Sequence, residues 1–248
     1  MSRYIEASCK LCRREGEKLF LKGARCLTEK CSVEKRAYAP GQHGQTAARR
    51  RKASQYSRQL REKQKVKRMY GLTETQFRNV FNTVLHEAGV TGENLLVALE
   101  LRLDNVVYRL GFQPSRKAAR QLVTHGHVEV NGRRVDVPSY RCRQGDEVRV
   151  SRASKDLDTV AASLDLASKG QTVSWLAADR DARTGKITER PTRDTIPVAA
   201  QEFATRGQPV SWIQVDADKA AGKVTERPTR DAIPLNAQEQ LIVELYSK

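Results

Sequence analysis

The chain has 248 residues, of which 39% are hydrophobic, 6% aromatic and 30% charged, and its formal net charge is +16. This length suits one large domain or two to three small ones, and the few aromatic residues favour several small cores. No apolar run approaches the roughly 18 residues that span a bilayer, and the first residues lack a signal-peptide core. A secreted or integral membrane protein is therefore disfavoured.

The positive charge is concentrated in the first third of the chain. Residues 1–70 carry 20 basic and 6 acidic side chains, a balance of +14, and residues 71–155 carry 13 and 9, a balance of +4. Residues 156–248 carry 12 and 14, a balance of −2. A chain polarised in this way more often binds nucleic acid or another anionic surface than acts as a uniformly basic enzyme.

Four of the five cysteines form the pattern C-x2-C-x13-C-x4-C, made of Cys9, Cys12, Cys26 and Cys31. Two close pairs can place four thiolates around one tetrahedral ion, and the basic residues in the loop between them stabilise thiolates. Two disulfides fit poorly, because no secretory signal is present and intracellular thiols stay reduced. The pattern predicts a metal centre, with zinc preferred and an iron–sulfur cluster as the alternative. Cys142 is expected to be an ordinary buried thiol.

A basic segment follows, with ten basic residues and one acid, Glu62, between positions 45 and 68. A solvated helix face is the simpler interpretation, but the imbalance leaves too few i,i+4 pairs to offset repulsion. Phosphate binding would relieve the repulsion and release counterions. The predicted phosphate-binding residues of this basic arm are Arg49, Arg50, Arg51, Lys52, Arg58, Arg61, Lys63, Lys65, Lys67 and Arg68.

Two helices are predicted next. Thr73 and Gln76 have the spacing of a capping box, and apolar residues then recur at the 3.6-residue period up to a stop at Gly89. The residues expected to face inward are Phe77, Val80, Phe81, Val84, Leu85 and Ala88. A second, continuous helix is predicted from about Glu93 to Gly111.

The segment 99–152 then has the pattern of a compact module. Ser115 is a good N-cap for a helix through about His125, and Asn131-Gly132 predicts a hairpin turn between two alternating strands. A further strand is expected at 147–150. Two helices followed by short antiparallel strands make an α+β unit. The predicted phosphate-binding residues of the module are Ser115, Arg116, Lys117, Arg120, His125, His127, Asn131, Arg133 and Arg134.

Residues 102–112 and 115–135 closely resemble the alpha-L RNA-binding motif, and the whole chain resembles the family of bacterial small-subunit ribosomal protein four. Further motifs agree in order along the chain: Met1-Ser-Arg-Tyr4, Cys9-Lys-Leu-Cys-Arg-Arg-Glu-Gly16, Pro40-Gly-Gln-His-Gly44, Leu60-Arg-Glu-Lys-Gln-Lys65 and Glu239-Gln-Leu-Ile-Val-Glu-Leu-Tyr-Ser-Lys248. The resemblance implies a cytoplasmic structural protein of the ribosome that binds small-subunit ribosomal RNA directly and nucleates assembly of the body. It also implies a contribution to translational accuracy.

The resemblance implies partners as well. These are the fifth small-subunit protein and, near the mRNA entrance, the third, and contact with messenger RNA is allowed. No membrane partner, small-molecule substrate or catalytic activity is expected. Some members of the family repress their own operon, and some lack the N-terminal cysteines. Because this chain keeps all four, the metal interpretation carries over to it.

Two other functions are alternatives to the ribosomal one. An RNA-modifying enzyme or synthetase carrying the same module would need a catalytic domain, whereas the flanking segments have no nucleotide-binding loop, nucleophile elbow or metalloprotease motif. A zinc-dependent DNA-binding regulator would read base edges with one helix. The basic residues here are spread over an arm and a module edge, as shape-based binding to folded RNA requires.

The last third contains a tandem repeat. When 170–206 (copy 1) is laid on 207–243 (copy 2), 21 residues are identical at a constant offset of 37. The family has one such unit, so the extra length suggests an internal duplication. A neutral duplication is favoured over a second docking surface built from Arg190, Arg193, Arg227 and Arg230, because the region is nearly neutral.

The expected fold class is α+β, in five parts. These are a four-cysteine knuckle with a turn-rich segment (1–45), a basic arm and helical domain (46–98), the RNA-binding module (99–152), a linker helix with the extra repeat copy (153–206), and the second copy with the family ending (207–248).

Overall fold

The computed structural model describes residues 4–47, 54–143, 146–154, 157–168, 176–179, 184–187, 213–217, 221–224 and 238–246. The chain divides into two compact units: residues 1–95 with 236–248, and residues 96–235. Helices occur in both units, and one antiparallel sheet lies in the second, so the fold is α+β. Within the described ranges, no helix has the length and apolar character needed to cross a membrane.

The first unit begins with short elements around a small core. They are α1 (Cys9–Glu15), the 3-10 helix η1 (Gly23–Cys26), α2 (Ser32–Lys35) and α3 (Gly44–Ala47). Gly16 ends α1 at φ 76°, a left-handed conformation that lets its N–H donate to the carbonyl of Cys12. Four apolar side chains are buried in this segment, namely Leu11, Leu19, Phe20 and Leu21.

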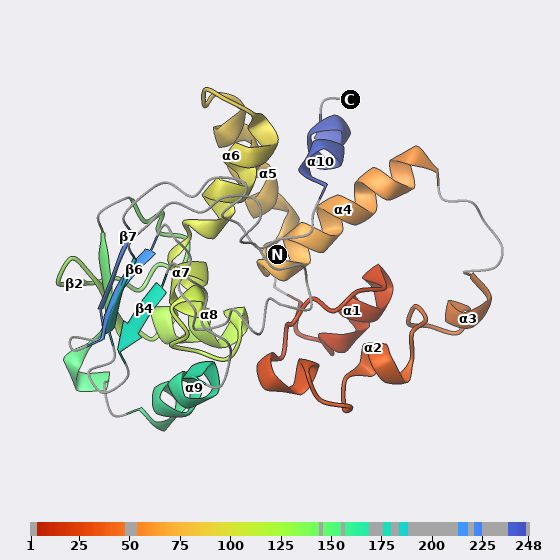
Figure 1. The fold of residues 1–248 in the computed structure, drawn as a ribbon. Helices are drawn as coiled ribbons and strands as arrows, with labels where there is room; N and C mark the ends of the chain where they lie inside the picture. The colour runs from red at the N-terminus through yellow and green to blue at the C-terminus, as the bar shows by residue number, and fades with distance from the viewer. Residues whose placement is uncertain are drawn as a thin grey trace. The chain divides into compact units, whose positions relative to one another are not determined.

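Three longer helices complete the first unit: α4 (Gln55–Met69), α5 (Glu74–Leu85) and the C-terminal α10 (Glu239–Tyr246). Figure 1 shows α10 beside α4, which it contacts, and the ring of Tyr246 stacks on Phe81 with centroids 4.4 Å apart. The predicted capping box at Thr73 is confirmed, since both reciprocal hydrogen bonds with Gln76 form. The helix ends four residues before Gly89, however. Leu85 is 49% exposed and Ala88, beyond the helix end, is exposed as well, so the predicted inward orientation of both residues is wrong.

The predicted continuous helix from 93 to 111 is also wrong, because two helices replace it. α6 (Thr91–Glu100) and α7 (Leu103–Arg109) are separated at Arg102, whose backbone is extended (φ −68°, ψ 137°). Arg102 forms an antiparallel bridge with Arg141, and the N–H of Leu103 donates to the carbonyl of Tyr140 at 2.8 Å. Hydrogen bonds to a distant loop therefore replace helical ones at this point.

The second unit is built on α7, α8 (Arg116–Thr124) and short strands. The Ser115 hydroxyl accepts the N–H of Ala118, as predicted for an N-cap. β1 (Val128–Val130) and β2 (Arg133–Arg134) are joined by Asn131-Gly132, both at positive φ (50° and 76°), so the predicted hairpin is confirmed. β3 (Glu147–Val150) pairs with β1 on its other side. The 3-10 helix η2 (Arg152–Ser154) and α9 (Asp158–Ser168) follow.

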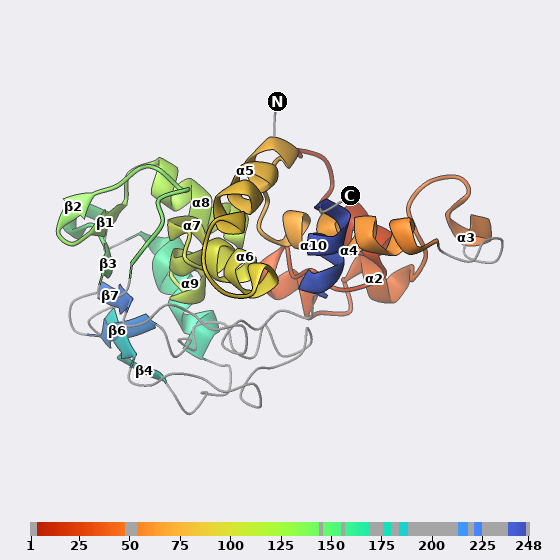
Figure 2. The same cartoon turned by 90° about the horizontal axis from the view of Figure 1, so that it is seen from above.

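The repeat adds four strands to this sheet. Copy 1 contributes β4 (Leu176–Asp179) and β5 (Thr184–Ile187), and copy 2 contributes β6 (Ile213–Ala217) and β7 (Ala221–Val224). The strand order is β2-β1-β3-β7-β6-β5-β4, and every pairing is antiparallel. Figure 2 shows β6 and β7 continuing the row of β1, β2 and β3. The four arginines suggested as a docking surface lie outside the described residues.

Candidate nucleic-acid interface

The four N-terminal cysteines belong to one small region and influence one another. Cys12, Cys26 and Cys31 are buried, and Cys9 is half-buried. Burial, together with the charges of the other three cysteines, raises the pKa of the Cys12 thiol to about 11. Burial also raises the pKa of Cys26, with Cys31 and Cys9 adding to the effect. Three of the four thiols that the spacing singles out are therefore buried in the first unit.

Thiols are suitable ligands for a soft divalent ion, but in this structure the four thiols are not arranged as a coordination site. Among the described residues, no group of three or more His, Cys, Asp or Glu side chains has a geometry that could hold a metal ion. The donor set itself, four sulfurs with three of them buried, is the set that structural zinc sites use.

Two glutamates of the cysteine segment bind cations of the basic arm. The Glu15 side chain is only 2% exposed and accepts hydrogen bonds from Arg61, at 3.4 Å, and from Arg68. Glu17 pairs with Lys65 at 3.3 Å. Burial raises the pKa of Glu15, and the charges of Arg68 and Arg61 oppose that rise. These arm cations thus hold the cysteine segment against α4.

Glu74 forms ion pairs with two further cations of the basic arm, Lys63 and Lys67. Its carboxylate lies 2.5 Å from Lys63 Nζ and 2.9 Å from Lys67 Nζ, and it accepts the hydroxyl of Tyr246 at 3.2 Å. Burial alone would raise the pKa of Glu74, but the hydrogen bonds from Lys63 and Lys67 lower it to about 2. The C-terminal helix is therefore fixed to α4 and α5 through one carboxylate.

We expect this carboxylate to make the first unit acid-sensitive. Its pKa lies below the ordinary value of 4.5, so its contribution to stability is present above pH 4.5 and is lost as the pH falls toward 2. Glu74→Gln should flatten the decline of the free energy of unfolding over that range, measured by urea titration at successive pH values. Glu6→Gln, at an exposed carboxylate, is the control, and an identical acid profile for wild type and Glu74→Gln would contradict the assignment.

The structure thus divides the predicted basic arm. Five of its six α4 cations are paired with carboxylates, and Arg58 is the exposed one, with no ion pair among the described residues. The other four, Arg49, Arg50, Arg51 and Lys52, lie outside the described residues. Phosphate contact by the arm stays a prediction, and α4 also has an internal role that the sequence did not reveal.

Two arginines predicted to bind phosphate in the module are held internally. Arg116 is 9% exposed; its Nε donates to Asn105 Oδ1 at 2.8 Å, and its guanidinium lies 4.6 Å from the centre of the Tyr108 ring. Arg120 Nη1 lies 2.9 Å from Asp104 Oδ2. Both side chains are therefore fixed in position by α7.

A buried ion-pair network lies beneath them. The Glu100 side chain is fully buried. Its carboxylate accepts hydrogen bonds from Arg109 Nε at 3.0 Å, from Arg109 Nη2 at 2.8 Å and from the side-chain amide of Asn105 at 2.7 Å. Asp104 accepts two hydrogen bonds from Arg102 as well as the one from Arg120. Sequence reasoning missed these acids; their one signal is that they interrupt an otherwise apolar run.

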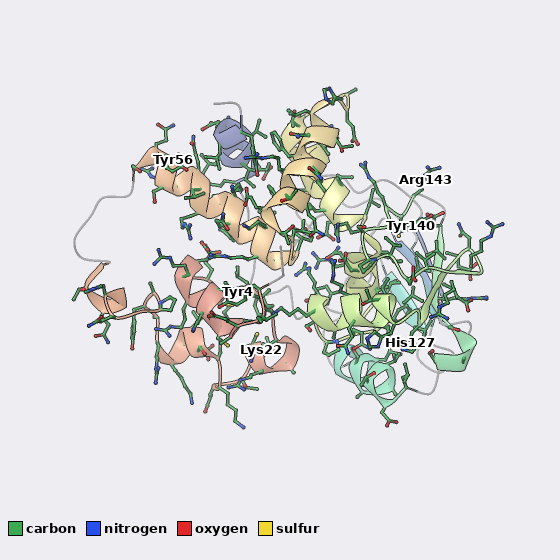
Figure 3. The ribbon with its side chains drawn as sticks, turned by 180° about the vertical axis from the view of Figure 1, so that it is seen from behind. Tyr4, Lys22, Tyr56, His127, Tyr140 and Arg143 are labelled. Atoms are coloured by element: carbon green, nitrogen blue, oxygen red, sulfur yellow. The ribbon has the colours of Figure 1, made fainter. Side chains whose placement is uncertain are left out.

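The remaining module residues lie around the β1–β2 hairpin and α8. Lys117, Arg133 and Arg134 are exposed, and so is His125. His127, labelled in Figure 3, is half-buried just before β1. Its Nδ1 lies 2.8 Å from the Ser154 hydroxyl.

Two of the predicted binding residues also have structural roles, and RNA contact by them stays a prediction. The amide of Asn131 donates to Asp146 and its oxygen accepts the N–H of Glu147, which fastens the hairpin turn to β3. The hydroxyl of Ser115 caps α8.

Exposed cations that the sequence analysis did not single out occur in the loop before β3. Arg141 and Arg143 are both exposed there, and Figure 3 shows Arg143 beside Tyr140. The exposed cations of the module therefore come from α8, the hairpin and this loop. Such a distributed set suits contacts with the phosphates of a folded polyanion rather than with one small ligand.

Comparisons with known proteins show the family to which the chain belongs. Residues 3–100 match the family described as Ribosomal protein S4/S9 N-terminal domain, and residues 101–148 match the S4 domain. The chain is 54% identical over 202 residues to small ribosomal subunit protein uS4A of Alkaliphilus oremlandii and 53% identical over 203 residues to uS4 of Thermus thermophilus. Each match covers 82% of this chain and 96% of the relative. The chain therefore belongs to the uS4 family of small ribosomal subunit proteins.

Proposed function

We propose that this protein is a structural constituent of the small ribosomal subunit and binds small-subunit ribosomal RNA directly. The observation that carries the proposal is the match of residues 101–148 to the S4 domain in a chain that covers 96% of small-subunit relatives at 50–54% identity. The exposed cations of α8, the hairpin and the loop before β3 supply the required positive surface.

The module binds RNA by holding positively charged side chains where they can contact phosphates, and no catalytic step is involved. The network around Glu100 and Asp104 fixes α7 against α8, so the backbone that carries Lys117 is ordered before RNA arrives. Contacts from exposed cations to phosphate release counterions and set orientation on the RNA. Ordering the protein in advance lowers the entropy cost of binding.

The resemblance to the family supports the proposal of a finer role. The protein acts in the cytoplasm within the ribosome, nucleates assembly of the subunit body, and contributes to translational accuracy with the fifth and third small-subunit proteins near the mRNA entrance. Sedimentation of a cell lysate tests the proposal: the full chain should co-migrate with small subunits at one copy per particle, and ribonuclease should release it. Recovery of the chain only in the protein fractions at the top of the gradient would contradict it.

We also propose that Cys9, Cys12, Cys26 and Cys31 hold zinc, with an iron–sulfur cluster as the alternative. The donor set and its burial support this, and a divalent cation would offset the burial that opposes free thiolates. A bound metal would order residues 1–45.

Elemental analysis of the purified protein should give about one zinc per chain. Cys26→Ser should lower that content and increase proteolysis of residues 1–45 while leaving the module folded. Cys142→Ser, at the buried cysteine outside the set, is the control for metal content. Full-length protein without zinc or iron would contradict the proposal.

The repeat is proposed to be an internal duplication. Its support is that 202 residues of this chain account for 96% of a relative, while copies 1 and 2 share 21 identities at one offset. A neutral duplication remains the preferred account of its origin.

A further inference from the structure

The two copies of the repeat form equivalent hairpins in the sheet. At the offset of 37, β4 corresponds to residues 213–216 of β6, and β5 corresponds to β7. Each copy thus supplies a first strand, β4 or β6, and a second strand, β5 or β7. The two strands of each copy pair with one another antiparallel.

The second strand of each copy also pairs antiparallel with a further strand outside its own hairpin, and its first two residues take part in both cases. In copy 2, Ala221 and Gly222 of β7 stand opposite Arg149 and Val148 of β3. In copy 1, the equivalent residues Thr184 and Gly185 of β5 stand opposite Ala217 and Asp216 of β6. The pairing of β5, from copy 1, with β6 therefore corresponds to the pairing of β7, from copy 2, with β3.

We infer that the edge of β3 is a docking site for the second strand of either copy. Copy 1 presents Thr-Gly-Lys at positions 184–186, where copy 2 presents Ala-Gly-Lys at positions 221–223. The alternative strand order, β3-β5-β4-β7-β6, uses only the kinds of pairing that the observed sheet already contains. Register is weakly specified in strands that contain glycine, so neither copy is excluded from this edge by its own sequence.

Connectivity explains why copy 2 occupies the edge in the complete chain. In the observed order, each strand from β4 to β7 lies beside its neighbour in sequence, which is the commonest arrangement. The alternative order requires residues 188–212 to cross the copy 1 hairpin. When copy 2 cannot pair, copy 1 is expected to take its place and keep the edge of β3 covered.

Two deletions of equal length test the inference. Removing 170–206 leaves copy 2, and removing 201–237 leaves copy 1 joined to an unchanged α10. Amide hydrogen exchange of peptides covering β3 should show the same protection in both deletions and in the full chain. Loss of β3 protection on removing 201–237 alone would overturn the inference.

A proline substitution provides an independent readout. Gly222→Pro removes a backbone donor from β7. In the full chain, β3 should stay protected because copy 1 replaces copy 2, whereas in the chain lacking 170–206 exchange at β3 should accelerate by at least about tenfold. Gly185→Pro in the full chain is the matched control and should leave β3 protected. Equal acceleration by Gly222→Pro in both backgrounds would refute the exchange of copies.

Discussion

Replacing Glu100 by glutamine is expected to lower the free energy of unfolding by about 3–5 kcal/mol, because it breaks a buried ion pair and leaves the other charge buried. Both Glu100 and Arg109 are at most 5% exposed, and the carboxylate accepts two hydrogen bonds from Arg109. A glutamine side chain also carries an NH2 group, which cannot accept the hydrogen bonds that Arg109 or Asn105 donates to the carboxylate at that position.

Urea unfolding of the full chain measures this effect, and Glu6→Gln is the matched control. Glu6 pairs with Lys10 on the surface, where an ion pair contributes about 0–1 kcal/mol. A loss from Glu100→Gln no larger than that from Glu6→Gln would show that the network does not support the module. Since a whole domain is stable by about 5–15 kcal/mol, the expected loss is a large share of it.

Neutralising Arg49, Arg50, Arg51 and Lys52 together is expected to flatten the salt dependence of RNA binding by up to about four units of slope. Each phosphate contact contributes about 0.9 units on duplex nucleic acid, and fewer contacts give a smaller change. The measurement is log Kd against log salt for a small-subunit ribosomal RNA fragment. An unchanged slope would exclude phosphate contact by these four residues.

The chain offers a matched set of four cations on α4: Arg61, Lys63, Lys65 and Arg68. Each is paired with a carboxylate, so changing them to glutamine should alter the slope by less than about one unit in total. Circular dichroism would check that the first unit remains folded. Equal flattening by both sets would contradict the internal role assigned to the α4 cations.

Local signals in the sequence predicted local structure well. The capping box at Thr73, the N-cap at Ser115 and the turn at Asn131-Gly132 depend on residues within four positions of one another. The break at Arg102 could not be predicted in the same way. It depends on hydrogen bonds to residues near position 140, while the apolar period continues across it.

The sequence predicted which basic residues belong to the candidate site, but it did not predict which of them pair with acidic residues of the protein itself. Counting charges along the chain located the basic arm, yet its cations meet Glu15, Glu17 and Glu74, which lie 7 to 53 positions away. In the module, charge alone predicts that Arg116 and Arg120 bind phosphate, whereas in the structure Asn105 and Asp104 hold their side chains. The resemblance to a ribosomal family identified the partner, whereas the fold identifies which cations remain exposed to meet it.

Filter binding at matched salt tests the central claim most directly. The full chain should bind a small-subunit ribosomal RNA fragment at least about 1,000-fold more tightly than a DNA duplex of equal length, as specific binding exceeds non-specific binding in charge-dominated complexes. Equal affinity for the two would contradict the claim that this basic surface recognises folded ribosomal RNA.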